Sequence, residues 1–407
     1  MHLTLLILAL LIVMPSHASD DFDTLYNNVV NSADIQMAED LLKKAQGSSL
    51  EENIARSFFL LAYLQYNEGM YYDALNNYFL SLRSYRKTKN KAKIAATTEN
   101  IGIIYRTARF YDKALEFYLQ ALKAKLELSD SSGIAGSYYN IGRIYRLNEQ
   151  YQEALQYLGK ALTMYKSLGN TKKVSHSYNE IGIVNRDLGH FSTAEDYYRR
   201  SRDVYKFNSD EYLKRESLML NNLGDLMIEQ GEYQLAKKYL DKAVSLEYLK
   251  HIKKDILSLA YSNLAKVHQQ LGKDSINYLL ELSVDVYPFK DFNPDIYESC
   301  KILADYYWTS DQHDLSKEYY DKIYQLGSDL SKLQSFLEDA NLRYQVEAAN
   351  YKITSQLKAE AAEYERKKGI VVNGIVSLIA FFILIVIFKQ QLKKKKERRA
   401  LLKQLMS

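Results

Sequence analysis

Asparagine recurs in this chain at a spacing that could do chemistry. Four asparagines stand two residues before a glycine or its equivalent, and in one further segment the asparagine comes one position earlier: Asn100, Asn140, Asn222, Asn263 and Asn179. An amide side chain both donates and accepts hydrogen bonds, so a row of them could bind the backbone of an extended peptide without reading its sequence. The same side chains could instead bond neighbouring helices and fix their arrangement, and the sequence leaves both interpretations open.

Arginine forms a second column, at the fourth residue after the glycine in three segments and at one neighbouring position: Arg106, Arg146, Arg186 and Arg143. If these guanidinium groups face a common groove, they would favour an acidic peptide or a terminal carboxylate through bidentate hydrogen bonds. If they lie on the rim of that groove, they are ordinary solvated helix residues.

Tyrosine is the third candidate, because the chain has 36 tyrosines and only one tryptophan. Most tyrosines of the recurring segments occupy positions expected to pack in a core. Tyr63, Tyr66 and Tyr139 fall instead at positions predicted to face the groove, where they would give a ligand rigid aromatic contacts.

Residues with catalytic or metal-binding spacing are scarce. The seven histidines form no HExxH pair, the glycines never gather into a GxGxxG or GxxxxGK loop, and the single cysteine, Cys300, cannot form an internal disulfide or a cysteine-based metal site. We therefore predict a protein that is not an enzyme, with no catalytic residue, no metal and no cofactor. Cys300 is expected to be a small, buried helix residue.

The elements that must position these columns repeat about every 40 residues. Each copy has a glycine and, twelve residues later, an alanine, among apolar residues at three- and four-residue spacing. This pattern predicts two helices per copy, which cross closely at the small residues. The glycines are Gly102, Gly142, Gly182 and Gly224, and the alanines are Ala114, Ala154, Ala194 and Ala236.

These residues, with the tyrosine three positions after the first two glycines, resemble the tetratricopeptide repeat (TPR) over roughly residues 51–327. The resemblance implies an all-α superhelical solenoid of about six to seven helix-turn-helix repeats, and we expect residues 19–50 to form helices that cap its N-terminal end. The ~40-residue period exceeds the usual ~34 residues, and the proline that normally ends each second helix is missing. The longer subclass fits better, and its turns should fall at polar or glycine dipeptides: Lys89-Asn90, Ser132-Gly133, Gly169-Asn170 and Ser209-Asp210.

The longer repeats resemble those of kinesin light chains and of bacterial peptide-pheromone receptors, which hold extended peptides in a concave groove. The resemblance implies a protein or peptide ligand in such a groove, bordered here by the asparagine and arginine columns. The carboxylate-clamp pattern of chaperone-binding members is not reproduced, which puts binding of chaperone tails in doubt.

Both ends of the chain are apolar. Residues 1–18 read as a signal peptide that is too short to span a bilayer, with small residues before an expected cleavage after Ala18, although an uncleaved anchor is an alternative. Residues 369–388 carry no charge, and at ~1.5 Å per residue they match the ~30 Å hydrocarbon core of a membrane. We predict a single transmembrane helix there, followed by a basic tail at 389–407.

The lysine and arginine excess of that tail predicts a cytoplasmic C-terminus, and a cleaved signal peptide predicts that the repeats lie outside. We therefore expect a single-pass protein of the cytoplasmic membrane with a periplasmic repeat domain. Residues 369–399 would contact membrane lipid, because a basic patch this close to a bilayer favours anionic headgroups over nucleic acid. No nucleic-acid partner is expected.

Residues 328–368 read as a long polar stalk helix with heptad-like apolar spacing at its start. This pattern fits a coiled coil that would allow a homodimer, a solvated single helix, or a helix packed back on the solenoid.

The order of parts resembles the sensing half of bacterial TPR-containing membrane regulators. It implies a module that binds a peptide or protein outside the membrane and passes the state inward as part of a signal-transduction or transcription-regulatory system. The sequence continues for only 19 residues past the predicted span, so we expect the output module to lie in a missing extension or in a separate cytoplasmic partner. A structural scaffold of an envelope complex, without signalling, is the alternative.

Overall fold

The computed structural model describes residues 16–246, 254–287 and 294–324, together with positions 331, 334, 335, 363 and 366. The chain divides into two compact units, Met1–Phe336 and Leu337–Ser407, and all helices named below belong to the first. The described residues form helices and turns without a strand, which confirms the predicted all-α class.

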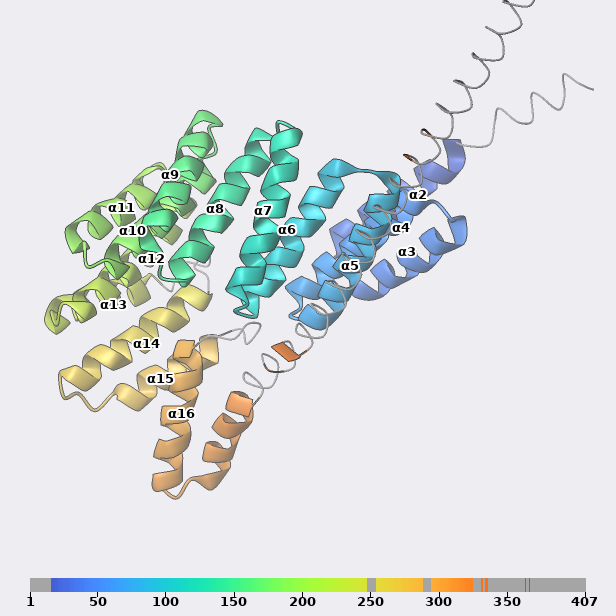
Figure 1. The fold of residues 1–407 in the computed structure, drawn as a ribbon. Helices are drawn as coiled ribbons and strands as arrows, with labels where there is room; N and C mark the ends of the chain where they lie inside the picture. Colours follow the sequence, from blue (N-terminus) through green and yellow to red (C-terminus); the bar gives the residue numbers. More distant parts are fainter. Residues whose placement is uncertain are drawn as a thin grey trace, which may run out of the picture. The chain divides into compact units, whose positions relative to one another are not determined.

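The helices follow one another in close succession (Figure 1). Their bounds are α2 (Ser16–Ser32), α3 (Ile35–Ser48), α4 (Glu51–Asn67), α5 (Tyr71–Thr88), α6 (Lys91–Thr107), α7 (Tyr111–Glu127), α8 (Ser131–Leu147), α9 (Tyr151–Ser167), α10 (Thr171–Asp187), α11 (Phe191–Asp203), α12 (Asp210–Glu229), α13 (Tyr233–Ser245), α14 (Lys254–Gln270), α15 (Ile276–Val286) and α16 (Pro294–Thr309), and a further helix covers 313–324.

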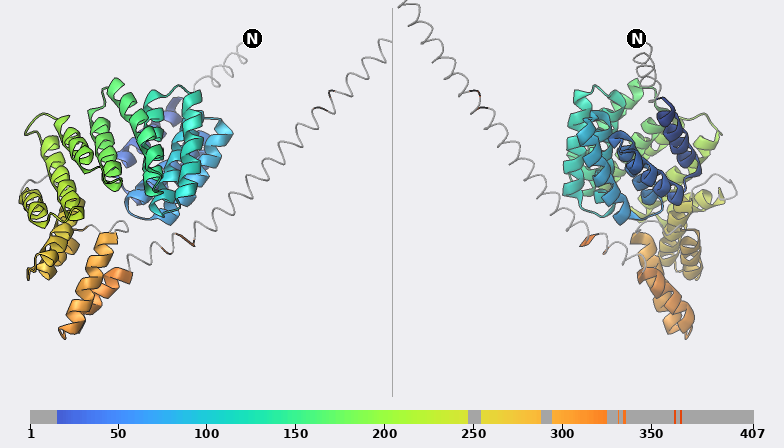
Figure 2. Two further views of the ribbon diagram at one scale, coloured as in Figure 1. Left: turned by 60° about the vertical axis from the view of Figure 1, so that its left-hand side comes forward. Right: turned by 90° about the vertical axis from the view of Figure 1, so that its right-hand side faces the viewer.

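From α4 onward the helices pair as antiparallel hairpins, each an even-numbered first helix followed by an odd-numbered second helix. Each second helix also packs on the next first helix, and successive first helices such as α8 and α10, or α12 and α14, contact each other directly. The hairpins therefore stack in chain order as a helical solenoid (Figure 2), with α2 and α3 packed at its N-terminal end on α4.

Turn chemistry explains where the first helices begin. Asn90, Asp130, Asn170 and Ser209 each stand just before a first helix, and their side chains accept a hydrogen bond from the backbone N–H three residues later. Such N-caps satisfy one of the free donors of the first turn. The predicted turn at Ser132-Gly133 was wrong, because Asp130 caps α8 and both residues already belong to its first turn. The other predicted dipeptides lie at helix junctions.

The crossing glycines confirm the predicted close approach of the paired helices. A Cβ built on Gly142 would lie 2.8 Å from the Leu158 side chain and 3.1 Å from its backbone nitrogen. On Gly182 it would lie 2.6 Å from the Tyr198 ring, and Gly102 and Gly224 are equally crowded by Tyr118 and Leu240. The partner alanines, from Ala114 to Ala236, are fully buried. These small residues let each hairpin close.

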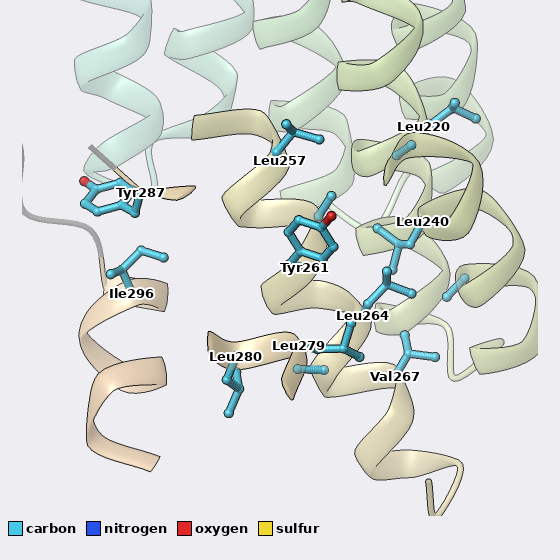
Figure 3. Packing of buried hydrophobic residues seen from close by; sticks show 14 of the residues in the cluster. Leu220, Leu240, Leu257, Tyr261, Leu264, Val267, Leu279, Leu280, Tyr287 and Ile296 are labelled. Carbon is cyan, nitrogen blue, oxygen red and sulfur yellow. The ribbon is translucent and has the colours of Figure 1, made fainter. Parts of the chain in front are cut away.

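The core runs along the stacked hairpins. Between α12 and α16 it contains Leu240 of α13, Leu264 of α14, Leu279 of α15 and Ile296 of α16 (Figure 3). Cys300 is also fully buried, as predicted, and burial raises the pKa of its thiol to about 11.

Serines bridge two of the helix pairs. The Ser175 hydroxyl of α10 donates to the Ser201 carbonyl of α11 at 2.6 Å, and Ser201 returns the bond to the Ser175 carbonyl at 2.8 Å. Ser258 of α14 and Ser283 of α15 make the same reciprocal pair, with both bonds at 2.8 Å.

The predicted targeting segments lie mostly outside the described residues. These are residues 1–15 of the signal peptide, nearly all of the stalk at 328–368, the span at 369–388 and the tail at 389–407. Residues 16–18, at the expected cleavage site, belong to α2. None of the helices in the described part of the chain combines the length and apolarity that a membrane crossing requires.

Candidate functional site

The predicted columns lie together on one surface, which we call the first-helix face. It consists of the side chains that α6, α8, α10 and α12 carry two and three residues before their glycine, and one, four and five residues after it. Most of these side chains are half-buried, and the contacts described below join successive first helices.

The asparagine column mainly joins neighbouring repeats. Asn140 of α8 donates to Glu99 of α6 at 2.9 Å. Asn222 of α12 donates to Asn179 of α10 at 2.8 Å. In the next repeat Asn263 donates to Asn221 at 3.3 Å, and Lys266 donates to Asn263 at 3.4 Å. These hydrogen bonds join the amides of Asn140, Asn222 and Asn263 to the neighbouring first helix.

Asn100 is the exception within the described part of the column. It is half-buried on α6, and its amide makes no hydrogen bond to the described residues. Its donor and acceptor therefore remain available to a ligand.

The arginines of α8 converge on one carboxylate. The Nε atom of Arg143 lies 3.1 Å from Glu180, and that of Arg146 lies 3.3 Å from the other oxygen of the same group. Glu180 is 7% exposed. Burial by itself would raise the pKa of Glu180, but Arg143, Arg146 and Arg106 outweigh it and hold that pKa below the usual range. We call these four residues the Glu180 cluster.

Arg106 is the member of that cluster that has no described carboxylate within ion-pair distance. It is half-buried on α6 and forms no ion pair with the described residues, although its charge acts on Glu180. It also lies beside the buried hydroxyl of Tyr118, whose pKa burial raises to about 12 against the opposing charge of Arg106. A cation without a carboxylate partner, held near a second and third arginine, is suited to an anionic ligand group.

Arg186 has the opposite environment. Its guanidinium lies 2.8 Å from Asp187 and 3.4 Å from Glu229, and it donates a hydrogen bond to Asp225 of α12. Burial raises the pKa values of Asp225 and Glu229 above the ordinary carboxyl range, against the opposing charge of Arg186. We call these four residues the Arg186 cluster. Arg146 links it to the Glu180 cluster, because one of its terminal nitrogens lies 3.8 Å from Asp187.

The predicted tyrosines lie at three different places. Tyr63 of α4 is 48% exposed, and Tyr66 is half-buried and packs at 5.5 Å against the Tyr71 ring. Tyr139 of α8 is half-buried beneath Arg143, whose guanidinium lies 5.8 Å from the ring centre. Tyr139 therefore supports the Glu180 cluster, whereas Tyr63 leaves an aromatic surface open at the α4 end of the first helices.

Sequence reasoning found the arginines but missed most of their acidic partners. Glu99, Asp187, Asp225 and Glu229 carry much of the polar network, yet the recurring columns pointed to none of them. The sequence did contain a recurring acidic position for two of them, because Asp187 and Glu229 both stand five residues after a crossing glycine. Among the described residues, no group of His, Cys, Asp and Glu is arranged to hold a metal ion.

Known proteins share this architecture. Residues 133–206 and 218–248 match two family models described as tetratricopeptide repeat. The sequence has no significant match among curated proteins. Three solved structures superpose on most of the chain at low identity, and they show the fold alone.

Aspartyl phosphate phosphatase F from Bacillus subtilis superposes with a TM-score of 0.53 at 13% identity, over 78% of this chain and 86% of its own. NprR in complex with its cognate peptide NprX gives 0.51 at 16%, over 80% and 98%. A Rap protein complexed with Competence and Sporulation Factor gives 0.50 at 12%, over 73% and 81%. The chain therefore carries tetratricopeptide repeats at residues 133–206 and 218–248, within an all-helical solenoid of the kind that these proteins form.

Proposed function

We propose that this chain is a non-enzymatic binding module whose ligand, an extended peptide or a protein segment, lies along the first-helix face. One observation carries the proposal: Asn100 bonds to no described residue, and Arg106 has no described carboxylate within ion-pair distance, beside a polar network that continues over four first helices. A strip of donors, acceptors and charges that extends over four helices suits an elongated ligand better than a compact one.

The proposal has support from proteins of the same fold. The NprR structure contains a cognate peptide, and the Rap structure contains Competence and Sporulation Factor. Those ligands belong to those proteins, and for this chain the argument rests on the residues of the first-helix face.

Selection of binders from a random peptide library tests the proposal, with the purified full chain as bait. The double variant N100A/R106A is the sharpest probe, because Asn100 bonds to no described residue and Arg106 forms no ion pair there, so the fold should survive their removal. Selected peptides should lose most of their affinity for N100A/R106A.

The control is R200A, which removes an arginine that is 54% exposed on the second helix α11. R200A should bind the selected peptides like the unchanged protein. Peptides that bind N100A/R106A with full affinity, in a variant that still unfolds cooperatively, would sink the proposal.

We further propose that the module is displayed outside the cytoplasmic membrane, anchored by residues 369–388, as the sensing part of a regulatory system. The support is the sequence: an N-terminal apolar segment with a cleavage pattern, a charge-free span and a basic tail. The intact mass of the protein from native membranes, together with protease access in spheroplasts whose outer envelope has been opened, tests this placement. An uncleaved chain protected from external protease would contradict it.

Sensing and scaffolding make different predictions for the span. Replacing residues 369–388 by an unrelated transmembrane helix should abolish signalling output while peptide affinity stays the same. A protein whose biological role survives that replacement would be a scaffold, the alternative that the sequence left open.

A further inference from the structure

The two charge clusters of the first-helix face have opposite compositions. The Glu180 cluster has three arginines around one carboxylate, whereas the Arg186 cluster has three carboxylates around one arginine. One therefore has an excess of about two positive charges and the other an excess of about two negative charges. They lie next to each other along the stack, the first on α6, α8 and α10 and the second on α10 and α12.

We propose that the ligand is a zwitterionic extended peptide, with an acidic group over α6 and α8 and a basic group over α10 and α12. This inference rests on the proposed function and specifies the chemistry and placement of its ligand.

The acidic group of the peptide has a defined receptor in Arg106. Because Arg143 and Arg146 already share Glu180, a carboxylate from the ligand would complete the balance of charge on α6 and α8. Guanidinium groups bind carboxylates through two parallel hydrogen bonds, which makes such a contact directional as well as strong.

The basic group of the peptide has an equally defined receptor. Asp225 is 31% exposed and Glu229 is 42% exposed, so both can reach a ligand while Arg186 satisfies only part of their charge. The Tyr198 hydroxyl is buried without a hydrogen-bond partner beneath these groups, close enough to Arg186, Asp225 and Asp187 for their charges to act on it. An ammonium or guanidinium group here would relieve the excess of negative charge.

The spacing of the clusters fixes the length of peptide between the two groups. Helices in contact lie about 8–10 Å apart, so three steps from Arg106 on α6 to Asp225 and Glu229 on α12 cover about 24–30 Å. An extended chain advances ~3.3 Å per residue, which places the acidic and basic side chains about eight residues apart.

Five synthetic decapeptides with blocked termini and the same six central residues test the proposal. The first two carry two aspartates at one end and two lysines at the other, in both orders, because the direction of the backbone is not part of the argument. The others have alanine in place of the lysines, the aspartates or both. One zwitterionic peptide should bind the full chain about tenfold more tightly than either singly charged peptide, and the neutral peptide should bind least.

Two variants show which end of the peptide lies over which charge cluster. R106A should cost the aspartate-bearing peptides about tenfold and leave the lysine-only peptide unchanged, because an interfacial charge pair of this kind typically contributes at least that factor. E229Q should cost the lysine-bearing peptides about tenfold and leave the aspartate-only peptide unchanged. R200A, on the opposite helix of its hairpin, should affect none of the peptides.

Three results would overturn the inference. They are equal binding of all five peptides, equal effects of R106A and E229Q on both ends, and no binding of any peptide. The library selection tests the proposed function separately. If its binders are uncharged or singly charged and still depend on Asn100 and Arg106, the first-helix face is a peptide-binding surface, but its ligand is not zwitterionic.

Discussion

Equivalent helix crossings in different repeats differ in whether their buried serine hydroxyls are hydrogen-bonded. Ser175 and Ser258 bond to serines on the paired helix, whereas Ser217 of α12 is fully buried and its hydroxyl has no hydrogen-bond partner. Ser217 stands 42 residues after Ser175, and the position matching Ser201 on the next second helix is Ala243, which has no hydroxyl. An unsatisfied buried hydroxyl costs stability that an alanine would not.

The variant S217A should therefore raise the free energy of unfolding by about 1 kcal/mol. S258A is the matched comparison, because it removes one side of a satisfied pair and should lower the same quantity by about 1–2 kcal/mol. Urea unfolding followed by circular dichroism measures both. Destabilisation by S217A would mean that its hydroxyl has a partner after all.

Glu180 and Asp225 should give the unfolding equilibrium opposite pH dependences. The folded state lowers the pKa of Glu180, so the unfolded chain binds more protons, and stability from this group is lost as the pH falls through about 4.3 and below. The folded state raises the pKa of Asp225, so the folded chain binds more protons, and this group favours folding as the pH falls toward its ordinary value of about 3.9.

E180Q should accordingly flatten the loss of stability between about pH 5 and pH 3, and D225N should steepen it. The measurement is the free energy of unfolding in urea at half-unit pH steps. Slopes that change in the same direction for both variants would contradict the assignment of opposite shifts.

At the scale of the helix pair, stability depends on crossings that tolerate no extra atom. G142A would drive a Cβ into Leu158, whose backbone nitrogen cannot move aside. Overpacking outweighs the better helix propensity of alanine, so G142A should destabilise the protein by about 1–2 kcal/mol.

Gly159 of α9, in the same hairpin, provides the control. A Cβ there meets nothing within 4 Å, and the residue is in a helix. G159A should stabilise the protein by about 0.5–1 kcal/mol through helix propensity alone. Thermal midpoints of the two variants should therefore move in opposite directions, and a stabilised G142A would show that the crossing can open.

The helix pairs were predictable because their signals are local. A glycine and an alanine twelve residues apart report a contact within one hairpin, and neighbouring apolar residues fix which faces meet. The start of α8 was less predictable, since Ser132 and Gly133 read as a turn until Asp130 is recognised as the cap. The first residue of the helix therefore depends on which of the nearby polar residues caps it.

At the scale of the whole molecule, contacts between first helices couple the hairpins. Stability in a repeat protein is close to a sum of hairpin terms and nearest-neighbour terms, so weakening one interface should divide the cooperative unit. N222A removes the bond from α12 to Asn179 of α10 and leaves that amide oxygen without its donor.

In N222A, hydrogen exchange measured by mass spectrometry should show α12–α15 opening while α4–α9 keep their protection. The matched variant N100A removes an amide that bonds to no described residue and should leave the exchange pattern unchanged. Uniform loss of protection in N222A would mean that the solenoid unfolds as one unit.

The polar network was the least predictable part of the candidate site. The asparagine and arginine columns were visible because they recur, but their partners lie about 40 residues away and depend on how each hairpin is rotated on the next. Arg146 and Arg186 both stand four residues after their glycine, yet Arg146 meets a glutamate that it shares with Arg143, and Arg186 meets three carboxylates. Rotation between hairpins is a property of the stack, and no single repeat encodes it.

Contacts between neighbouring first helices change along the stack: amide to carboxylate from α8 to α6, amide to amide from α12 to α10, and a lysine of α14 to Asp295 of α16. Each hairpin consequently fits its own neighbours and no others. Simple repeat arrays lengthen and shorten when unequal recombination copies or removes a unit. In this chain such an event would bury unmatched charges at the new junction, so the number and order of its hairpins should be held constant through inheritance.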